Sequence, residues 1–397
     1  MAKPLVFVLF LSLGLFALSQ ASPTGPAGPS QGIKIKRFST NPLFDFDDVQ
    51  QPCDGEYDIN FPTIIKTRRW MANRLGKYYM YFSDHHGLGI VVAYADDVKG
   101  PWTVRAPYTL TLKQVFEANG AVYNVSDLSY KAEAASADIY VDDDNQQILM
   151  YFHHRIPPNN YVSETSVAFS SDGLHFAPRA GRVGLPYIRH FTWRGDDDYI
   201  YLLDRVGNLL RSHDGYTNVE MGNGLVGQAF ANVSMANGDG YTGLLRHLGV
   251  SVVGHTLYVF GTRVGDAPER ILWTSMDLRC TLSNWTACEP DHLAREGFRP
   301  VMPYEGTDYP IEPSSKGSAI NVHQLRDPYP FADNGKCYIF YTIAGESGVA
   351  GAVLPDKFCF KNNKRSDEED EEEEEAFHVE SAVASSLKSW VNLAFGV

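Results

Sequence analysis

The feature that most constrains this chain is a short aromatic and apolar run that recurs five times. The five runs are Lys77–Ser83, Gln147–His153, Tyr199–Leu203, His255–Phe260 and Lys336–Thr342. Recurrence at intervals of roughly 50 to 80 residues is typical of repeat architectures, in which each repeat is one supersecondary unit. The sequence therefore predicts five copies of one unit, each built around an aromatic strand.

Polar turns around these runs set the number of strands in each unit. An earlier strand enters through turns such as Asp142–Asn145, so each run is expected to be the second strand of a meander. Two of the hairpins that follow contain Asp-Gly turns, at Ser170–Gly173 and Ser212–Gly215, and Asp-Gly is typical of tight hairpins. Four antiparallel strands make one blade, so we predict an all-β, five-bladed β-propeller over residues 53–360. A sandwich with coincidental spacing is the alternative.

The two ends of the chain differ from the ring in composition. Residues 1–21 have a single Lys3, an apolar stretch and a small-residue ending, which is the pattern of a secretory signal peptide. Residues 22–52 are rich in Pro, Gly and Ser near their start, and we interpret them as a leader or linker. The sequence thus predicts a secreted, extracellular protein without a transmembrane span.

The region after the ring is strongly acidic. The block Asp367–Glu375 accounts for most of the net charge of −14, so residues 361–376 are predicted to be a disordered acidic linker. Apolar residues at helical spacing then predict an amphipathic helix over residues 377–397. The acidic run is a solubilising spacer or attracts Ca²⁺ or matrix. We expect no nucleic-acid partner.

Cysteines and sequons fit a secretory route. Cys280 and Cys288 flank a short turn and are expected to form a local disulfide. A second bond, between Cys53 and Cys359, would join the two ends of the ring, and Cys337 is expected to be a buried free thiol. The chain also carries three N-glycosylation sequons, at Asn124, Asn232 and Asn284.

Charged and titratable residues occupy the stretches that precede four of the aromatic strands. The innermost strands of a propeller line its channel, so equivalent positions in different blades should meet there. Recurrence of such groups where a strand should be apolar indicates a site. They are Asp138, Arg189, His190, Arg246, His247, Arg326 and Asp327.

The aromatic second strands, the Asp-Gly hairpins and the stretches Arg326–Pro328 and Ser136–Ile139 resemble five-bladed carbohydrate-active propellers, the arabinanase and β-xylosidase-like glycoside hydrolases. The resemblance implies inverting hydrolysis by an Asp base in the first blade, a tuning Asp in the third and a Glu acid in the fourth, with about 6.5–9.5 Å between acid and base. The corresponding stretches here are Phe61–Pro62, Arg189–His190 and Arg246–His247. None of the three carboxylates is at its expected place.

Other residues are therefore assigned to the site. Asp138, His190, His247 and Asp327 are the predicted catalytic residues, because histidine can act as acid or base near neutral pH. The predicted substrate-binding residues are Arg189, Arg246, Arg326, His86, His154 and Glu346. Adjacent strand residues point to opposite faces, so only one of each pair His85–His86 and His153–His154 should face a ligand.

No cofactor is required by this assignment. The resemblance implies that a Ca²⁺ can lie near a histidine of the last blade, for which His323 is the candidate. Three functions remain open from the sequence. A glycoside hydrolase-like enzyme with an Asp, His and Arg site comes first, acting on poly- or oligosaccharide. The alternatives are a uronate-specific polysaccharide lyase, and a non-catalytic glycan-binding or matrix protein with a calcium-attracting tail.

Overall fold

The computed structural model describes residues 32–49, 58–85, 87–123, 132–156, 162–193, 198–231 and 245–361. Within them the inner strands are β3 (Asn60–Lys66), β7 (Glu133–Asp142), β11 (Arg189–Thr192), β15 (Leu245–Val253) and β19 (Arg326–Asp333). The second strands are β4 (Tyr78–Ser83), β8 (Gln147–Arg155), β12 (Ile200–Leu203), β16 (Thr256–Arg263) and β20 (Lys336–Ile343).

The third strands are β5 (Gly89–Ala95), β9 (Glu164–Ser170), β13 (Leu209–Ser212), β17 (Ile271–Asp277) and β21 (Gly348–Leu354). The outer strands are β6 (Thr103–Thr111), β10 (Ala177–Pro178), β14 (Glu220–Met221), β18 (Arg295–Phe298) and β1 (Lys36–Arg37), and β2 (Phe44–Asp45) adds a short pairing to β21. The helices are short: α1 (Leu112–Ala118), α2 (Leu225–Phe230), α3 (Thr281–Asn284) and 3-10 turns at Phe46–Asp48, Leu278–Cys280, Trp285–Ala287, Pro303–Glu305 and Asp356–Phe358.

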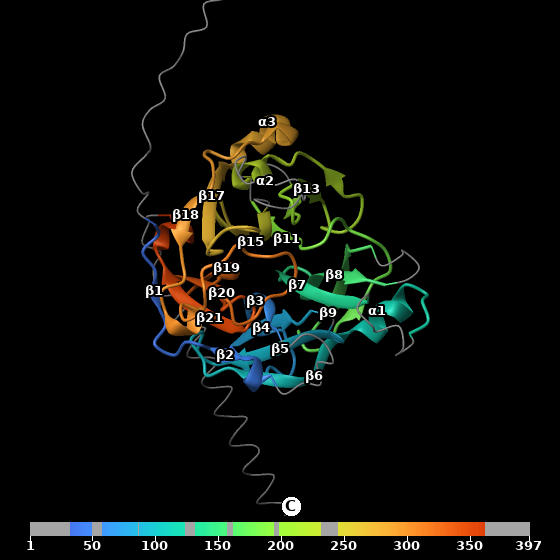
Figure 1. Cartoon of the computed structure of the whole chain (residues 1–397). Coiled ribbons are helices and arrows are strands. Elements are labelled where there is room, and N and C mark those ends of the chain that lie inside the picture. The colour runs from blue at the N-terminus through green and yellow to red at the C-terminus, as the bar shows by residue number, and fades with distance from the viewer. Residues whose placement is uncertain are drawn as a thin grey trace, which may run out of the picture. The chain divides into compact units, whose positions relative to one another are not determined.

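These strands form five antiparallel sheets arranged as blades around a common centre (Figure 1). Each inner strand packs against the inner strand of the next blade, and β19 packs against β3, which closes the ring. All five aromatic runs are second strands. The predicted five-bladed propeller with four antiparallel strands per blade is confirmed.

The aromatic runs exist because both faces of a blade are covered by its neighbours. In β4, Tyr79 and Tyr81 pack into the core shared with the second blade, whereas Tyr78, Met80 and Phe82 pack into the core shared with the last blade. Successive strand residues point to opposite faces. A strand buried on both faces needs apolar residues at every position, which produces a continuous run instead of an alternating one.

The predicted Asp-Gly hairpins join third strands to outer strands as expected. Asp172 accepts a hydrogen bond from the backbone N–H of Leu174 at 2.8 Å, and Gly173 has φ of 74°. In the next blade Asp214 accepts from the N–H of Tyr216 at 2.9 Å. The carboxylate thus satisfies turn amides while glycine provides the left-handed backbone.

The last blade is completed by the start of the described chain. Lys36 in β1 pairs with Val353 of β21, and Phe44 in β2 pairs with Val349. This pairing corrects the assignment of residues 22–52 as a leader or linker, because part of that segment is a structural strand of the ring. This pairing could not be predicted from the sequence, since a two-residue strand has no periodicity.

The disulfides correct part of the cysteine prediction. Cys280 and Cys288 are bonded as expected. Cys359 is bonded to Cys337, so the prediction of a Cys53–Cys359 bond and of a free thiol at Cys337 was wrong. The bond joins the second strand of the last blade to the segment after β21, because the chain folds back beside that strand.

Several predictions concern residues outside the described ranges: the signal peptide, Cys53, His86, Asn124, Asn232, the acidic linker and the C-terminal helix. Asn284 is exposed at the end of α3, where its side-chain oxygen accepts a hydrogen bond from Thr286 at 2.8 Å. In the described parts of the chain, no helix has the length and apolar content needed to cross a bilayer.

Candidate active site at the mouth of the ring

The side of the ring where inner strands begin and second strands end is called the mouth here. Near the mouth the inner strands β3, β7, β15 and β19 each have a β-bulge. In four blades a residue at this level has positive φ: Phe61 (55°), Ser136 (55°), Tyr187 (62°) and Asp327 (49°). Such backbone costs about 1–3 kcal/mol for a non-glycine residue and clusters at functional sites. Strained backbone therefore recurs at the mouth in four of the five blades.

Arg189 closes the channel one layer below the bulges. Its side chain is fully buried and reaches one residue of each of the other four blades: Phe61, Asp138, Leu248 and Tyr329. Nη1 lies 3.0 Å from Asp138 Oδ1, Nε donates to the Leu248 carbonyl at 2.8 Å, and Cζ lies 3.6 Å from the Phe61 ring centroid. We call this layer the channel floor, because one buried side chain contacts the other four blades across the channel.

Asp138 belongs to the floor. Oδ2 accepts hydrogen bonds from the backbone N–H of His190 at 2.7 Å and contacts its Nδ1 at 2.6 Å. Burial opposes ionisation, but His190 and Arg189 outweigh it and lower the pKa of Asp138. The structure therefore brings three predicted site residues together, as a buried ion-paired group.

A chain of buried ion pairs forms one side of the mouth. Arg326 lies 2.8 Å from Glu346 Oε1 and 3.2 Å from Glu269 Oε2, and Arg246 Nε lies 2.8 Å from Glu269 Oε1. The predicted anchors Arg246 and Arg326 thus hold carboxylates of the chain itself. Glu269, which sequence reasoning missed, joins them.

His247 and Asp327 form a third pair. His247 Nδ1 is hydrogen bonded to Asp327 Oδ1, and the backbone N–H of Phe61 donates to Oδ2 at 3.0 Å. Burial opposes ionisation of Asp327, but His247 outweighs it and the pKa of Asp327 is lowered. Asp327 is thus ionised and orients the imidazole.

Tyr187 lies between two histidines at the mouth. Its ring centroid is 4.5 Å from that of His153 and 4.4 Å from that of His247, and the guanidinium of Arg205 lies 5.4 Å from it. Tyr187 is half-buried, and burial raises the pKa of its hydroxyl, which keeps the phenol protonated. It presents a proton donor at the mouth that the sequence did not reveal.

His153 is held by a buried carboxylate. Nε2 lies 2.8 Å from Glu133 Oε1, and Arg155 pairs with the other oxygen of Glu133 at 2.7 Å. Burial lowers the pKa of His153, so the imidazole is neutral and donates from Nε2. Nδ1 is then an acceptor, and it is buried with no hydrogen-bond partner among the described residues. An imidazole in this state can take up a proton.

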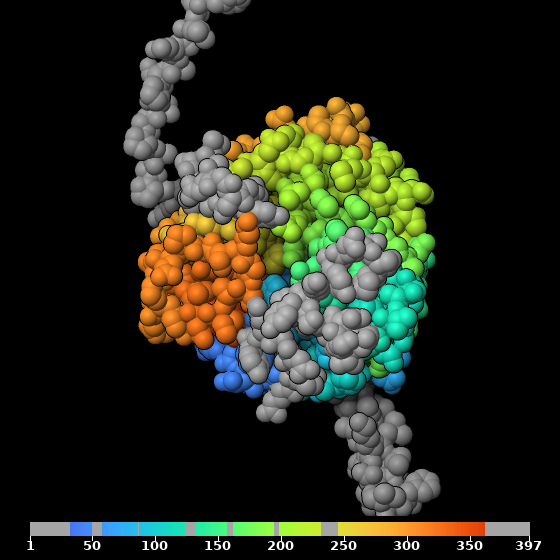
Figure 2. Space-filling view, turned by 45° about the vertical axis from the view of Figure 1, so that its right-hand side comes forward, coloured from blue at the N-terminus to red at the C-terminus, as the bar shows by residue number. Residues whose placement is uncertain are grey.

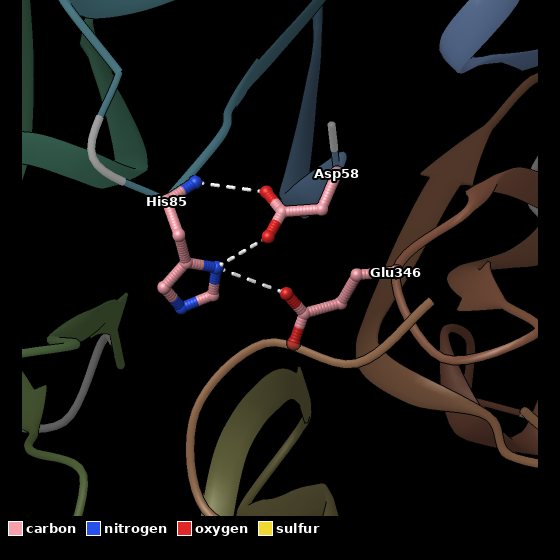
Figure 3. Close-up of side chains that lie close together, drawn as sticks. All are labelled: Asp58, His85 and Glu346. Atoms are coloured by element: carbon pink, nitrogen blue, oxygen red, sulfur yellow. Dashed lines mark hydrogen bonds and ion pairs between the residues drawn. The ribbon is translucent and has the colours of Figure 1, made fainter. Parts of the chain in front are cut away.

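A group of three residues, Asp58, His85 and Glu346, joins the first and last blades. His85 Nδ1 lies 2.9 Å from Asp58 Oδ2 and 3.0 Å from Glu346 Oε2, and Asp58 Oδ1 accepts the backbone N–H of His85 at 2.8 Å. Figure 3 shows both carboxylates on one side of the imidazole. Burial raises the pKa of Asp58. In the described residues this is the one group of acidic and imidazole side chains close enough to share a metal ion.

Two predicted residues lie elsewhere. His154 points away from His153, and its Nε2 is 2.8 Å from Ser166 Oγ in a buried position on β8. His323 Nδ1 lies 3.2 Å from the Tyr309 carbonyl and is not part of the metal-compatible group. Of the two side chains at this end of β8, His153 is therefore the one at the mouth.

Sequence reasoning missed Asp58, Glu133, Tyr187 and Glu269. Asp58 and Glu133 had a usable signal, since they are acidic residues at equivalent positions near the start of an inner strand. Each lies two residues before the last paired residue ahead of the β-bulge, which is Asn60 in β3 and Ala135 in β7. Tyr187 and Glu269 had none, because their neighbours come from other blades.

The positions of the family carboxylates carry other side chains. Phe61 is a buried ring under the Arg189 guanidinium, and Arg246 is paired with Glu269. Five carboxylates near the mouth are at most 3% exposed and each is ion-paired: Asp58, Glu133, Glu269, Asp327 and Glu346. Half-buried Tyr187 is thus more exposed than any of these carboxylates, and the buried Nδ1 without a hydrogen-bond partner belongs to the His153 ring beside it.

Figure 2 shows a hollow between the orange surface of the last blade and the green surface of the third blade.

No protein-family model matches the sequence. A glycosyl hydrolase from Bacteroides ovatus has a similar structure, with a TM-score of 0.53 and 13% identity over 81% of this chain and 94% of that one. A structure from the GH130 family, described as containing glycoside hydrolases that target β-1,2 mannosidic linkages in Candida mannan, gives 0.51 and 12% over 82% and 96%. These likenesses show the fold.

One relative is much closer in sequence. Uncharacterized protein R118 of Acanthamoeba polyphaga mimivirus is 51% identical over 338 residues, which cover 83% of this chain and 92% of that protein. The chain therefore belongs to the same protein family as R118, built on the five-bladed propeller fold found in glycoside hydrolases.

Proposed function

We propose that this protein is a secreted carbohydrate-active enzyme that cleaves poly- or oligosaccharide at the mouth of the ring. The fold it shares with glycoside hydrolases supports a saccharide substrate by analogy. The two disulfides support an oxidising compartment. The observation that carries an enzymatic role is Tyr187, a half-buried residue with left-handed backbone between two histidines.

The proposed chemistry is proton transfer by phenol and imidazole. Tyr187 touches the substrate and donates a proton to the leaving oxygen, while His153 Nδ1 accepts one. Glu133 and Asp327 are positioning residues, because each holds an imidazole from behind. Hydrolysis by an inverting carboxylate pair would need two accessible carboxyl groups about 6.5–9.5 Å apart. The five carboxylates that pair with the histidines and arginines of the mouth, Asp58, Glu133, Glu269, Asp327 and Glu346, are all buried.

A uronate-specific β-elimination is the second candidate, and the same residues favour it. In this reaction a base removes the proton next to the uronate carboxyl group, the C–O bond to the leaving sugar breaks, and an acid protonates the leaving oxygen. A cation must neutralise the uronate. Arg155, whose side chain is 28% exposed, and Arg205 beside Tyr187 are the cations at this place. Hydrolase and lyase thus differ in product more than in the residues used.

The test is a glycan panel containing neutral and uronate polymers, followed for new reducing ends and for ultraviolet absorbance of an unsaturated product. Tyr187→Phe should lower turnover by about 100-fold or more, since acid–base groups contribute about 10²–10⁴. Tyr199→Phe is the matched control, because Tyr199 stacks on His213 with centroids 4.1 Å apart at the end of blade 3 remote from the mouth.

Three outcomes separate the functions. Reducing ends without absorbance, lost in Tyr187→Phe, support hydrolysis; reducing ends with absorbance support elimination. Equal turnover in the two tyrosine variants refutes the role of Tyr187. Glycan binding without any product refutes the enzymatic proposal and supports a binding protein, a role consistent with the complete pairing of the buried carboxylates.

A further inference from the structure

Three ligand-type atoms converge where the first and last blades meet at the mouth. Asp58 Oδ2, His85 Nδ1 and Glu346 Oε2 all lie within 4.8 Å of one another, and the two carboxylates are buried. We propose that these three residues bind one divalent transition-metal cation, with Zn²⁺ or Mn²⁺ as the ions that suit them. The proposal does not depend on what reaction the mouth carries out.

Hydrogen bonding alone leaves this group incompletely satisfied. His85 Nδ1 carries at most one proton, yet it faces two carboxylate oxygens and the amide nitrogen of Asn60 at 3.1 Å. Glu346 Oε2 is fully buried and has no hydrogen-bond partner among the described residues, although it lies 3.0 Å from Nδ1. A buried acceptor in this state calls for an ion or a water. A cation between the three atoms would satisfy all of them at once.

The donor set selects the class of ion. Ca²⁺ takes six to eight oxygen ligands, which one imidazole and two carboxylates do not supply. Imidazole suits Zn²⁺ and its neighbours, and carboxylate suits Mn²⁺ as well. Three protein ligands also leave a position open, as in catalytic zinc sites. The site therefore differs from the calcium expected beside His323.

The outer contacts resemble those that orient metal ligands. Asp58 Oδ2 also accepts a hydrogen bond from the Ser318 hydroxyl, and Oδ1 accepts the backbone N–H of His85. Glu346 Oε1 is held by Arg326 at 2.8 Å, which leaves Oε2 directed at the imidazole. Such partners fix ligand orientation, and losing one typically costs about 10- to 100-fold in metal affinity.

The other carboxylate–histidine pairs at the mouth lack this arrangement. Glu133 occupies in blade 2 the place of Asp58 in blade 1, and it also holds a histidine. Its second oxygen is paired with Arg155 at 2.7 Å, and among the residues that the structure describes no second carboxylate joins it at His153 to form a metal-compatible group. Glu133→Gln is therefore a matched control for the loss of a buried, histidine-bound carboxylate.

The experiment uses the full chain, stripped with a chelator and titrated separately with Zn²⁺, Mn²⁺ and Ca²⁺ by equilibrium dialysis with metal analysis. We expect one tightly bound Zn²⁺ or Mn²⁺ per chain and weaker binding of Ca²⁺. Asp58→Asn and Glu346→Gln should each weaken binding by more than about 100-fold, since they remove a ligand and not only an outer partner. Glu133→Gln should bind as the unaltered protein does.

A spectroscopic measurement on the unaltered protein covers the case in which a variant fails to fold. Electron spin echo of bound Mn²⁺ should detect one imidazole nitrogen among its ligands. The proposal is overturned if Asp58→Asn and Glu346→Gln bind like the unaltered chain, if Ca²⁺ binds more tightly than the transition metals, or if the bound Mn²⁺ shows no nitrogen ligand. None of these outcomes depends on a saccharide substrate.

Discussion

Replacing Arg189 with methionine tests whether the channel floor holds the five blades together. Methionine keeps most of the side-chain length but removes the charge and every hydrogen bond. The change leaves Asp138 buried without its guanidinium partner and the Leu248 carbonyl without its donor. It also removes the cation from the face of the Phe61 ring.

The expected loss is large for a single substitution. Removing one partner of a buried ion pair costs about 3–5 kcal/mol, because the other charge stays uncompensated. Desolvated cation–π contacts add up to about 2 kcal/mol. The free energy of unfolding of a protein domain is about 5–15 kcal/mol, so Arg189→Met should remove about a fifth of the stability or more. Asp138 keeps its contacts with His190 after this change, and adding Asp138→Asn removes the remaining buried charge and should recover part of the loss.

The assay is urea unfolding followed by tyrosine and tryptophan fluorescence. Arg211→Met is the control, because Arg211 also lies over aromatic rings, 4.1 Å from Tyr199 and 4.3 Å from Trp285, but its carboxylate partner Glu220 is half exposed, and exposed ion pairs contribute about 0–1 kcal/mol. The double variant with Asp138→Asn should show a coupling energy of about 0.5–3 kcal/mol. A loss in Arg189→Met no larger than in Arg211→Met would refute the reasoning, as would strict additivity with Asp138→Asn.

Two further predictions concern stability. Burial lowers the pKa of His154 to about 4 from 6.5, so the unfolded state takes up the proton first as the pH falls. The free energy of unfolding present above about pH 6.5 should therefore fall by up to about 3 kcal/mol towards pH 4. His154→Gln, which keeps the contact to Ser166, should flatten this loss in urea unfolding at several pH values, and parallel curves would contradict the prediction. Replacing both Cys337 and Cys359 with serine should lower the free energy of unfolding by about 3 kcal/mol, because their bond closes a loop with a sequence separation of 22. This loss should exceed that from removing the Cys280–Cys288 bond, whose sequence separation is 8. Thermal or urea unfolding measures both, and the reverse order would contradict the loop-entropy argument.

The blades could be predicted because their signal is local. Each aromatic run is continuous along the chain, and the Asp-Gly turns follow it within a short distance. The runs reflect the burial of the second strand on both faces, and the turns reflect the left-handed backbone of a tight hairpin, features that recur from blade to blade. The outer strand β1 could not be predicted, because Lys36–Arg37 has only two residues and is a strand only through its pairing with β21, which lies far along the chain.

The site was predicted only in part. Asp138, Arg189, His190, His247, Arg326 and Asp327 do meet at the channel, as equivalent inner-strand positions must in a ring. Their roles could not be derived, because the residues that face a charged side chain of an inner strand decide whether it fills the channel, forms structural ion pairs or is reactive. Arg189 fills the channel because Asp138 and the Phe61 ring lie opposite it. Arg246 forms an ion pair with Glu269 and therefore does not serve as a free anchor for a ligand.

By itself the sequence determined the all-β class, the five repeats, the order of strands and one local disulfide, because these depend on neighbours along the chain. The tertiary structure decided which blade receives β1, which cysteine bonds Cys359, and which groups surround Tyr187 and His85. The physical reason is ring closure. It brings Asp58 of the first blade against Glu346 of the last, and no periodicity within either blade records that contact.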